Sequence, residues 1–170
     1  MDVIPLAFEH ETAPREFIAD FVAAGETRIP AYFADPDWTH GEIVQRFEAW
    51  SQGEDLDDGW VPSTTRFLID EGRILGVVNL RHRLNDSLRR VGGHVGFAVR
   101  PSGRNRGHGA RLLEAAESQA REMGIERLLV TCDEENTASR RVIEKRGGLL
   151  SDVQTDAVCG ERTMRFWIDL

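Results

Sequence analysis

An arginine- and glycine-rich segment, Arg104-Asn105-Arg106-Gly107-His108-Gly109-Ala110, combines residue types that suit phosphate binding. It follows the apolar stretch Phe97-Ala98-Val99 and precedes a helical pattern, so a strand–loop–helix junction is expected. The first four N–H groups of a helix have no intrahelical partner and lie at the positive end of its dipole. The two glycines would let a ligand approach these groups, and the two arginines would add charged contacts. The segment therefore predicts a pyrophosphate site.

Two other phosphate-binding motifs do not fit the segment. A P-loop needs lysine followed by serine or threonine after its glycines, and neither pair occurs here. A dinucleotide-binding G-x-G-x-x-G motif that starts at Gly107 would need glycine where Leu112 stands. A helix that merely begins with glycines stays open as an alternative, because short motifs recur by chance.

The pattern of apolar residues predicts the elements that position this loop. Strands are expected at residues 1–8, 64–70, 74–83, 94–100, 127–131, 149–158 and 162–168. Helices are expected at residues 12–25, 39–50, from the glycine segment to 124, and 136–146. Residues 71–73 should close a hairpin, and residues 85–92 should form a longer turn, which gives an antiparallel meander of three strands. No linker divides this mixed α/β order, so a single domain over residues 1–170 is predicted.

The charge of the chain argues against non-specific binding to nucleic acid. The formal net charge is −8, whereas such binding needs a basic surface that displaces counterions. An acidic surface favours a cationic acceptor such as a free amine, although it can equally serve solubility alone.

Other sequence features point to a cytoplasmic protein without membrane partners. No apolar run approaches the roughly 20 residues that span a bilayer, and the first residues lack the basic start of a signal peptide. The two cysteines, Cys132 and Cys159, are too few for a disulfide scaffold or a zinc site. No metal is therefore expected.

The spacing Arg104-x-x-Gly107-x-Gly109-Ala110 resembles the acyl-CoA signature (Q/R)-x-x-G-x-(G/A) of the GNAT N-acetyltransferase superfamily. A second stretch, Asn136-x-x-Ser139 followed by Glu144-Lys145-x-Gly147, is similar to that family's N-x-x-(A/S)-x-x-x-Y-x-K-x-G segment. Three shorter segments also resemble a bacterial subgroup of predicted acetyltransferases: Arg81-His82-x-Leu84-Asn85, Gly92-Gly93-His94-Val95-Gly96-Phe97 and Cys132-Asp133-x-x-Asn136.

The resemblance implies a GNAT acyl-CoA N-acyltransferase fold, with a mixed, splayed central β-sheet flanked by helices. It implies acetyl-CoA as co-substrate and an amine acceptor, and it allows a homodimer. The implied acetyl-CoA-binding residues are Phe97, Ala98 and Val99 at the splayed strand edge, Arg104 to Ala110 around the pyrophosphate, and Asn136 and Ser139 near the pantetheine. For Asn136, a helix N-cap alone is the open alternative.

The same resemblance leaves the proton chemistry open. The family often carries an acid tyrosine seven residues after its asparagine, and here that residue is Ile143; the one tyrosine, Tyr32, lies far away in the sequence. His94 is the preferred base, because a histidine pKa near 6.5 suits proton transfer near neutrality; a structural hydrogen bond is its alternative. His82, Glu134 and Cys132 are further candidates, with a buried inert thiol as the alternative for Cys132.

We therefore expect transfer of an acetyl group from acetyl-CoA to an amine by direct attack on the thioester. The alternatives are a non-catalytic acyl-CoA-binding module with the same fold and a nucleotide-binding protein of another kind.

Overall fold

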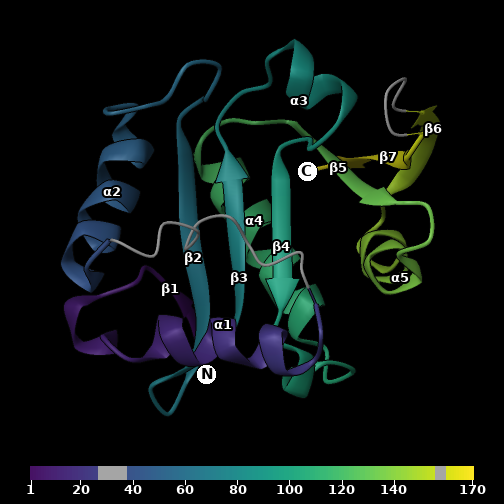
Figure 1. Ribbon diagram of the computed structural model, residues 1–170. Coiled ribbons are helices and arrows are strands. Elements are labelled where there is room, and N and C mark those ends of the chain that lie inside the picture. Colours follow the sequence, from purple (N-terminus) through teal and green to yellow (C-terminus); the bar gives the residue numbers. More distant parts are fainter. Residues whose placement is uncertain (27–37, 156–159) are drawn as a thin grey trace.

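A central sheet, with helices on both faces, organises the chain (Figure 1). The computed structural model describes residues 1–26, 38–155 and 160–170. In these ranges the sheet has seven strands in the order β1-β2-β3-β4-β5-β7-β6. Helices α1 (Ala13–Ala23) and α2 (His40–Gln52) cover one face, and α4 (His108–Glu122) covers the other. The predicted mixed α/β architecture is thus confirmed.

An antiparallel half of the sheet contains the predicted meander. Its strands are β1 (Asp2–Ile4), β2 (Ser63–Asp70), β3 (Arg73–Arg81) and β4 (Val95–Val99). Each is antiparallel to the next. Glu71 and Gly72 connect β2 to β3 with φ values of 47° and 75°, which are the left-handed conformations that suit a two-residue hairpin loop.

The second half of the sheet meets the first through a very short parallel contact. Strand β5 (Arg127–Asp133) pairs with β4 at one position, Val95 with Val130. On its other side β5 is antiparallel to β7 (Arg162–Asp169), which is antiparallel to β6 (Leu149–Thr155). Beyond their single pair β4 and β5 form no ladder, so the sheet is splayed at this point, as expected.

One predicted turn is wrong. Residues 85–92 contain a short helix, α3 (Asp86–Arg90), because the Asn85 side chain accepts a hydrogen bond of 2.9 Å from the Leu88 N–H. This N-cap satisfies a free N–H group of the helix. The Asn85 amide also donates to the Gly59 carbonyl at 2.7 Å, which ties α3 to the loop after α2.

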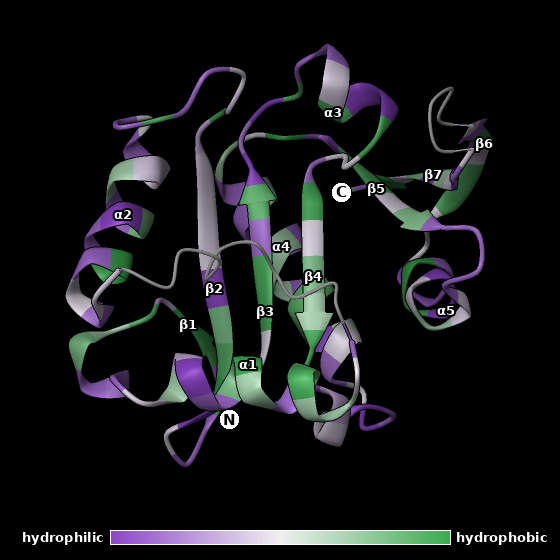
Figure 2. Ribbon diagram, in the orientation of Figure 1, coloured by the Kyte–Doolittle hydropathy of each residue, from purple (hydrophilic) through white to green (hydrophobic). Residues whose placement is uncertain are grey.

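Two apolar clusters fill the two faces of the sheet. Figure 2 shows hydrophobic residues, in green, along the strands between them. The cluster on the α4 side includes Leu68, Val78, Leu80, Val95, Leu112, Leu113, Val130, Ile143 and Phe166. The cluster under α1 and α2 includes Phe17, Phe21, Ile43, Phe47, Trp50, Phe67 and Val77. Fully burying one such side chain contributes about 1.5–3 kcal/mol.

Some predictions fall outside the described residues, namely those on Tyr32, on Cys159 and on the end of the strand expected at residues 149–158. No helix within the described ranges has both the length and the apolar character needed to cross a bilayer.

Candidate active site

The loop between β4 and α4 reaches the helix through two left-handed residues. Asn105 has a φ of 61°, and Gly107, the N-cap of α4, has a φ of 80°. A Cβ on Gly107 would meet nothing within 4 Å, so its φ and not its packing calls for glycine. The Arg111 N–H donates to the Gly107 carbonyl at 3.3 Å. The preceding N–H groups of residues 108–110 have no intrahelical acceptor and can bind an anion.

Gly109 has a different function from Gly107. A Cβ at this position would lie 3.2 Å from Val142 Cγ2 and 3.5 Å from Phe97 Cε2. Glycine therefore lets the start of α4 pack closely against α5 (Thr137–Lys145) and β4. The two glycines of the sequence motif therefore act differently, Gly107 through backbone conformation and Gly109 through close packing.

His108 is buried at the start of α4 and anchors the loop. A Cβ on Gly103 would lie 3.6 Å from His108 Cδ2, so the ring packs against the short 3-10 turn before the loop. Burial lowers the pKa of His108, and the charges of Arg106 and Arg111 lower it further. The ring is therefore neutral near pH 7, which argues for packing and against a charged contact to phosphate.

The backbone of β4 presents alternate residues to its two neighbours. The Arg100 N–H donates to the Leu75 carbonyl at 3.0 Å, so Arg100 faces β3, as does Ala98 two residues earlier. Phe97 and Val99 alternate with these residues and face β5. Of the three strand residues in the sequence prediction, the structure therefore brings Phe97 and Val99, but not the backbone of Ala98, to the splayed edge.

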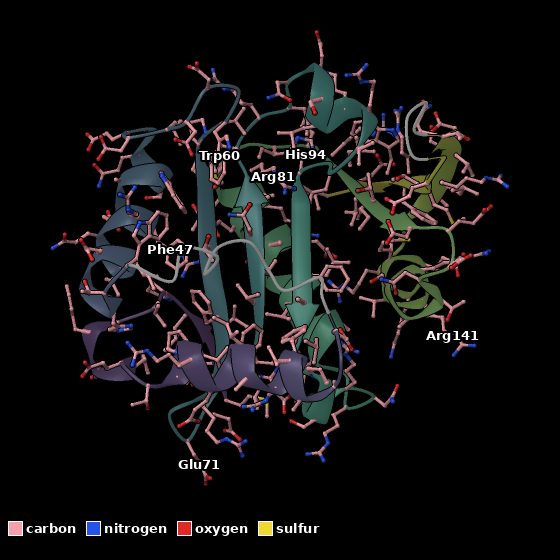
Figure 3. All side chains as sticks on the ribbon, in the orientation of Figure 1. Phe47, Trp60, Glu71, Arg81, His94 and Arg141 are labelled. Atoms are coloured by element: carbon pink, nitrogen blue, oxygen red, sulfur yellow. The ribbon has the colours of Figure 1, made fainter. Side chains whose placement is uncertain are left out.

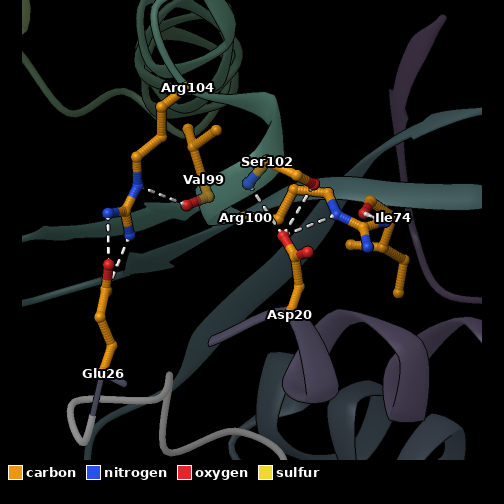
Figure 4. A network of polar contacts seen from close by, with 7 residues as sticks. All are labelled: Asp20, Glu26, Ile74, Val99, Arg100, Ser102 and Arg104. Atoms are coloured by element: carbon orange, nitrogen blue, oxygen red, sulfur yellow. Dashed lines mark hydrogen bonds and ion pairs between the residues drawn. The ribbon is translucent and has the colours of Figure 1, made fainter. Parts of the chain in front are cut away.

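The side chain of Arg104 points to α1, as Figure 4 shows. Its two terminal nitrogens donate to the Glu26 carboxylate at 2.5 and 2.9 Å, and its Nε donates to the Val99 carbonyl at 3.2 Å. The hydrogen bonds that Arg104 donates to Glu26 raise the pKa of Arg104. The guanidinium that the sequence assigns to a phosphate contact is thus engaged by a carboxylate.

Asn136 caps α5 at the end of β5. Its Oδ1 accepts a hydrogen bond of 2.9 Å from the Ser139 N–H, so the capping alternative is present. This bond uses one side-chain oxygen, and the amide NH₂ group can still donate to a ligand. The structure therefore places Asn136 and Ser139 in one helical turn beside the splay.

Ile143 occupies the position where the family often has tyrosine. It is fully buried in the apolar cluster on the α4 side. A Cβ on Gly148 would lie 2.5 Å from Ile143 Cγ2, so the backbone after α5 packs directly on this side chain. The position is part of the core and carries no acid.

His94 joins β4 to β5 at the point where the strands begin to diverge. The Leu129 N–H donates to His94 Nδ1 at 2.9 Å, and the ring lies 6.5 Å from that of Trp167. Burial lowers the pKa of His94 to about 4, assisted by the charges of Arg89 and Arg81. Because the Nδ1 lone pair is engaged and the ring resists protonation, the geometry favours the structural alternative over a general base.

His82 lies on the opposite face of the sheet from His94. Its Nε2 is hydrogen-bonded to Thr64 Oγ1 at 2.8 Å. Thr64 pairs with Leu80, whose side chain faces α4, so Thr64 and His82 lie on the α4 side of the sheet. Trp167, which contacts His94, alternates with residues of the α4-side cluster and therefore projects to the other face. The structure does not bring the two histidines together. Both lie toward the α3 end of the sheet, where Figure 3 labels His94.

The last two candidate residues differ in access to solvent. Cys132 is 8% exposed, and burial together with Asp133 raises its pKa to about 11. A neutral buried thiol is a weak nucleophile and a weak acid, which favours the inert alternative. Glu134 is 39% exposed and lies 3.2 Å from Arg162 Nε. Glu134 is the one carboxylate among the four acid–base candidates, and it is partly exposed.

A groove of about 520 Å³ opens at the carboxyl end of β5. Its lining consists of Asp133, Glu134, Glu135, Asn136, Gly160, Glu161 and Arg162. The groove adjoins the N-cap of α5, so Glu134 and Asn136 share one cavity. Within the described ranges, no three His, Cys, Asp or Glu side chains are grouped to hold a metal ion.

Sequence reasoning missed the residues that connect distant segments to this site. Glu26 and Asp20 lie about 80 residues before their partners, and no local pattern marks them. Gly93 has a φ of 60°, and a Cβ there would lie 2.4 Å from the Leu129 carbonyl oxygen. The Gly92-Gly93 pair in the sequence could have indicated such a close approach between strands.

The acetyltransferase (GNAT) family model matches residues 27–148. No curated protein matches the chain. Solved structures match the chain, and one of them is the RimL ribosomal L7/L12 alpha-N-protein acetyltransferase in complex with coenzyme A. The two sequences are 15% identical, the match covers 99% of this chain and 93% of that chain, and the TM-score is 0.69.

Two further solved structures are similar to this chain. The putative acetyltransferase yncA from Salmonella typhimurium, with acetyl-CoA, has 16% identity, 96% and 91% coverage of this and that chain, and a TM-score of 0.63. The microcin C7 self-immunity acetyltransferase MccE, in complex with acetyl-CoA and AMP, has 12% identity, 99% and 91% coverage and a TM-score of 0.68. At these identities the likeness establishes the fold.

Proposed function

Because the chain belongs to the acetyltransferase (GNAT) family, we propose that it transfers an acetyl group from acetyl-CoA to an amine of a small molecule or peptide. The observation that carries the proposal is the single pair between β4 and β5, which leaves an open backbone edge ending beside the N-terminus of α4. An extended pantetheine arm can pair with such an edge as an added strand would. The acetyl-CoA and coenzyme A in solved structures of this fold support the proposal.

The residues at this edge fit the chemical groups of coenzyme A. The backbone of Phe97 and the N–H of Val99 would pair with the pantetheine amides, and Asn136 and Ser139 would donate to the same arm from the β5 side. The N–H groups from Asn105 to Ala110 would hold the pyrophosphate, which gains from the positive end of the α4 dipole. These contacts use backbone groups more than charged side chains.

The reaction needs close approach of two bound substrates more than it needs a reactive side chain. The acceptor nitrogen attacks the thioester carbonyl carbon, so a C–N bond forms, the C–S bond breaks and coenzyme A leaves as a thiolate. Holding both reactants in one orientation lowers the barrier by converting a bimolecular step into an intramolecular one. A backbone N–H at the splayed edge would stabilise the developing charge on the carbonyl oxygen.

The proton of the attacking amine needs an acceptor, and Glu134 is the proposed one. Its carboxylate is partly exposed in the groove at the end of β5, and Arg162 lies beside it. The amine proton would pass to Glu134 and from there to solvent, and solvent would protonate the thiolate. Because Ile143 is buried in the core, no side chain at that position can serve as the acid.

A non-catalytic acyl-CoA-binding module is the second candidate. The observation that favours it is the same buried Ile143, because a binding module has no need of the family's usual tyrosine. Both candidates bind coenzyme A, and only turnover separates them.

Two measurements test the proposal. Acetyl-CoA at 100 times its Kd should stabilise the chain by about 2.7 kcal/mol in a thermal shift assay, and no shift would count against both candidates. Release of free coenzyme A with a panel of amines, amino acids, polyamines and peptides then reports turnover. Glu134→Gln should lower kcat about 100-fold with an unchanged Kd for coenzyme A, whereas Glu135→Gln in the same groove should not. An equal kcat in both variants would assign the proton to solvent.

A further inference from the structure

Two carboxylates of the α1 segment hold the loop that leads into α4 (Figure 4). Asp20 Oδ2 accepts three hydrogen bonds, from the Ser102 N–H at 3.0 Å, the Ser102 hydroxyl at 2.9 Å and Arg100 Nε at 3.2 Å. Glu26, three residues after the end of α1, binds Arg104 through both of its oxygens. Helix α1 and the residues that directly follow it therefore fix both the beginning and the middle of the loop.

The Asp20 contact is partly buried and well satisfied. The Arg100 side chain is 6% exposed, and its second donor reaches the Ile74 carbonyl at 3.2 Å. Burial would raise the pKa of Asp20, but hydrogen bonds from Ser102 and Arg100 outweigh burial and lower it. The carboxylate is therefore charged near pH 7, and breaking this contact would leave Arg100 buried without a charged partner.

The Glu26 contact determines where Arg104 can reach. All three guanidinium nitrogens donate, two to Glu26 and one to the Val99 carbonyl, which is the last carbonyl on the splayed edge of β4. The ring of Phe21 lies 5.8 Å beneath the guanidinium. Moving Arg104 to a phosphate would break these bonds and leave the Glu26 carboxylate unpaired near an anion.

We propose that Glu26 and Asp20 are positioning residues for acetyl-CoA, which hold the loop so that its backbone N–H groups, and not the Arg104 side chain, bind the pyrophosphate. Arg104 in turn neutralises Glu26 and donates a hydrogen bond to the Val99 carbonyl at the end of the open β4 edge. This inference rests on the proposed function and adds the α1 segment to the binding machinery.

The competing role of Arg104, direct contact with phosphate, makes an opposite prediction for Glu26→Gln. If Glu26 positions the loop, the substitution loosens Arg104 and weakens coenzyme A binding by about threefold to fivefold, the scale of a partly exposed charged pair. If Arg104 binds phosphate directly, freeing it from Glu26 leaves the Kd unchanged or tightens it. Glu16→Gln, an equal loss of charge on the exposed face of α1, is the matched control and should leave the Kd unchanged.

The experiment measures the Kd of coenzyme A by calorimetry for the wild type, Glu26→Gln, Glu16→Gln and the charge swap of Glu26→Arg with Arg104→Glu. The swap should recover part of the lost affinity, because it restores the ion pair but not the hydrogen bond to the Val99 carbonyl, whereas a direct phosphate contact would be lost with Arg104. The KM of S-acetylpantetheine, which has no pyrophosphate, should stay within about twofold of the wild type in Glu26→Gln, and a general structural defect would raise it.

Three results would overturn the inference. They are an unchanged or lower Kd in Glu26→Gln, a swap that binds no better than Glu26→Gln, and a parallel rise of both the coenzyme A Kd and the S-acetylpantetheine KM. Should Glu26→Gln fail to fold, the swap alone decides between the two roles of Arg104. Absence of coenzyme A binding by the wild type would instead refute the proposed function itself.

Discussion

Acidification should destabilise the chain through His94, and His94→Asn should remove that effect. In the native chain His94 is 8% exposed and accepts the Leu129 N–H through Nδ1. Asparagine can present its Oδ1 near the Nδ1 position, so the hydrogen bond can persist while the titrating group is lost. The change in ring volume beside Trp167 adds an offset that does not depend on pH.

The size of the effect follows from the two pKa values of His94. The unfolded chain binds the proton as the pH falls through about 6.5, and the native chain binds it only near pH 4, because burial disfavours the charged ring. Falling pH therefore favours the unfolded state across this window. Stability is fully present above pH 6.5 and decreases toward pH 4. By linkage, about 2 kcal/mol is lost between pH 7 and pH 4.5.

Urea unfolding at pH 7.0, 6.0, 5.0 and 4.5 measures this difference. Other carboxylates titrate in both proteins, so the free energy of unfolding of the wild type minus that of His94→Asn isolates the histidine. A difference that stays constant from pH 7 to pH 4.5 would refute the buried, neutral His94. Turnover at pH 7.5 adds a second check, since a structural His94 predicts a kcat near that of the wild type, whereas a general base predicts a loss of about 100-fold or more.

Three further substitutions test the packing around the site, each by its free energy of unfolding. Arg146→Met should cost about 3 kcal/mol, because it removes the bidentate partner of the Glu117 carboxylate, which is 3% exposed; a loss below 1 kcal/mol would contradict this. Gly93→Ala should cost more than about 2 kcal/mol, since its φ is 60° and a Cβ would lie 2.4 Å from the Leu129 carbonyl oxygen; a neutral result would argue against the close contact of the strands. Ile143→Tyr should overpack the core, cost about 1–3 kcal/mol and leave kcat no higher; a raised kcat would show that this position reaches the thioester.

The sequence predicted most of the elements because their signals are local. Alternating apolar residues and the Glu71-Gly72 turn indicated the hairpin of β2 and β3, and Thr39 with Glu42 forms a capping box at the start of α2. The short helix α3 was missed because five residues carry too little periodicity to distinguish a helix from a turn. Its N-cap, Asn85, was a signal available in the sequence.

For the candidate site, the sequence indicated backbone features better than side-chain roles. The left-handed Gly107 and the capping Asn136 depend on their immediate neighbours, so their residue types were informative. The residue type of His94 allows both a general base and a structural hydrogen bond, and only the position of the Leu129 N–H distinguishes the two. A residue type reveals which bonds a side chain can form, but not which partner lies within reach.

The sequence by itself determined the loop from Arg104 to Ala110, because a strand, two glycines and a helix start fix the path of the backbone over a few residues. Tertiary structure decided what surrounds that loop. The sheet places β4 beside β5 with a single paired position, and the packing of α1 brings Glu26 to Arg104 across 78 positions of sequence. Such contacts depend on where whole elements pack against each other, and no short stretch of residues contains that information.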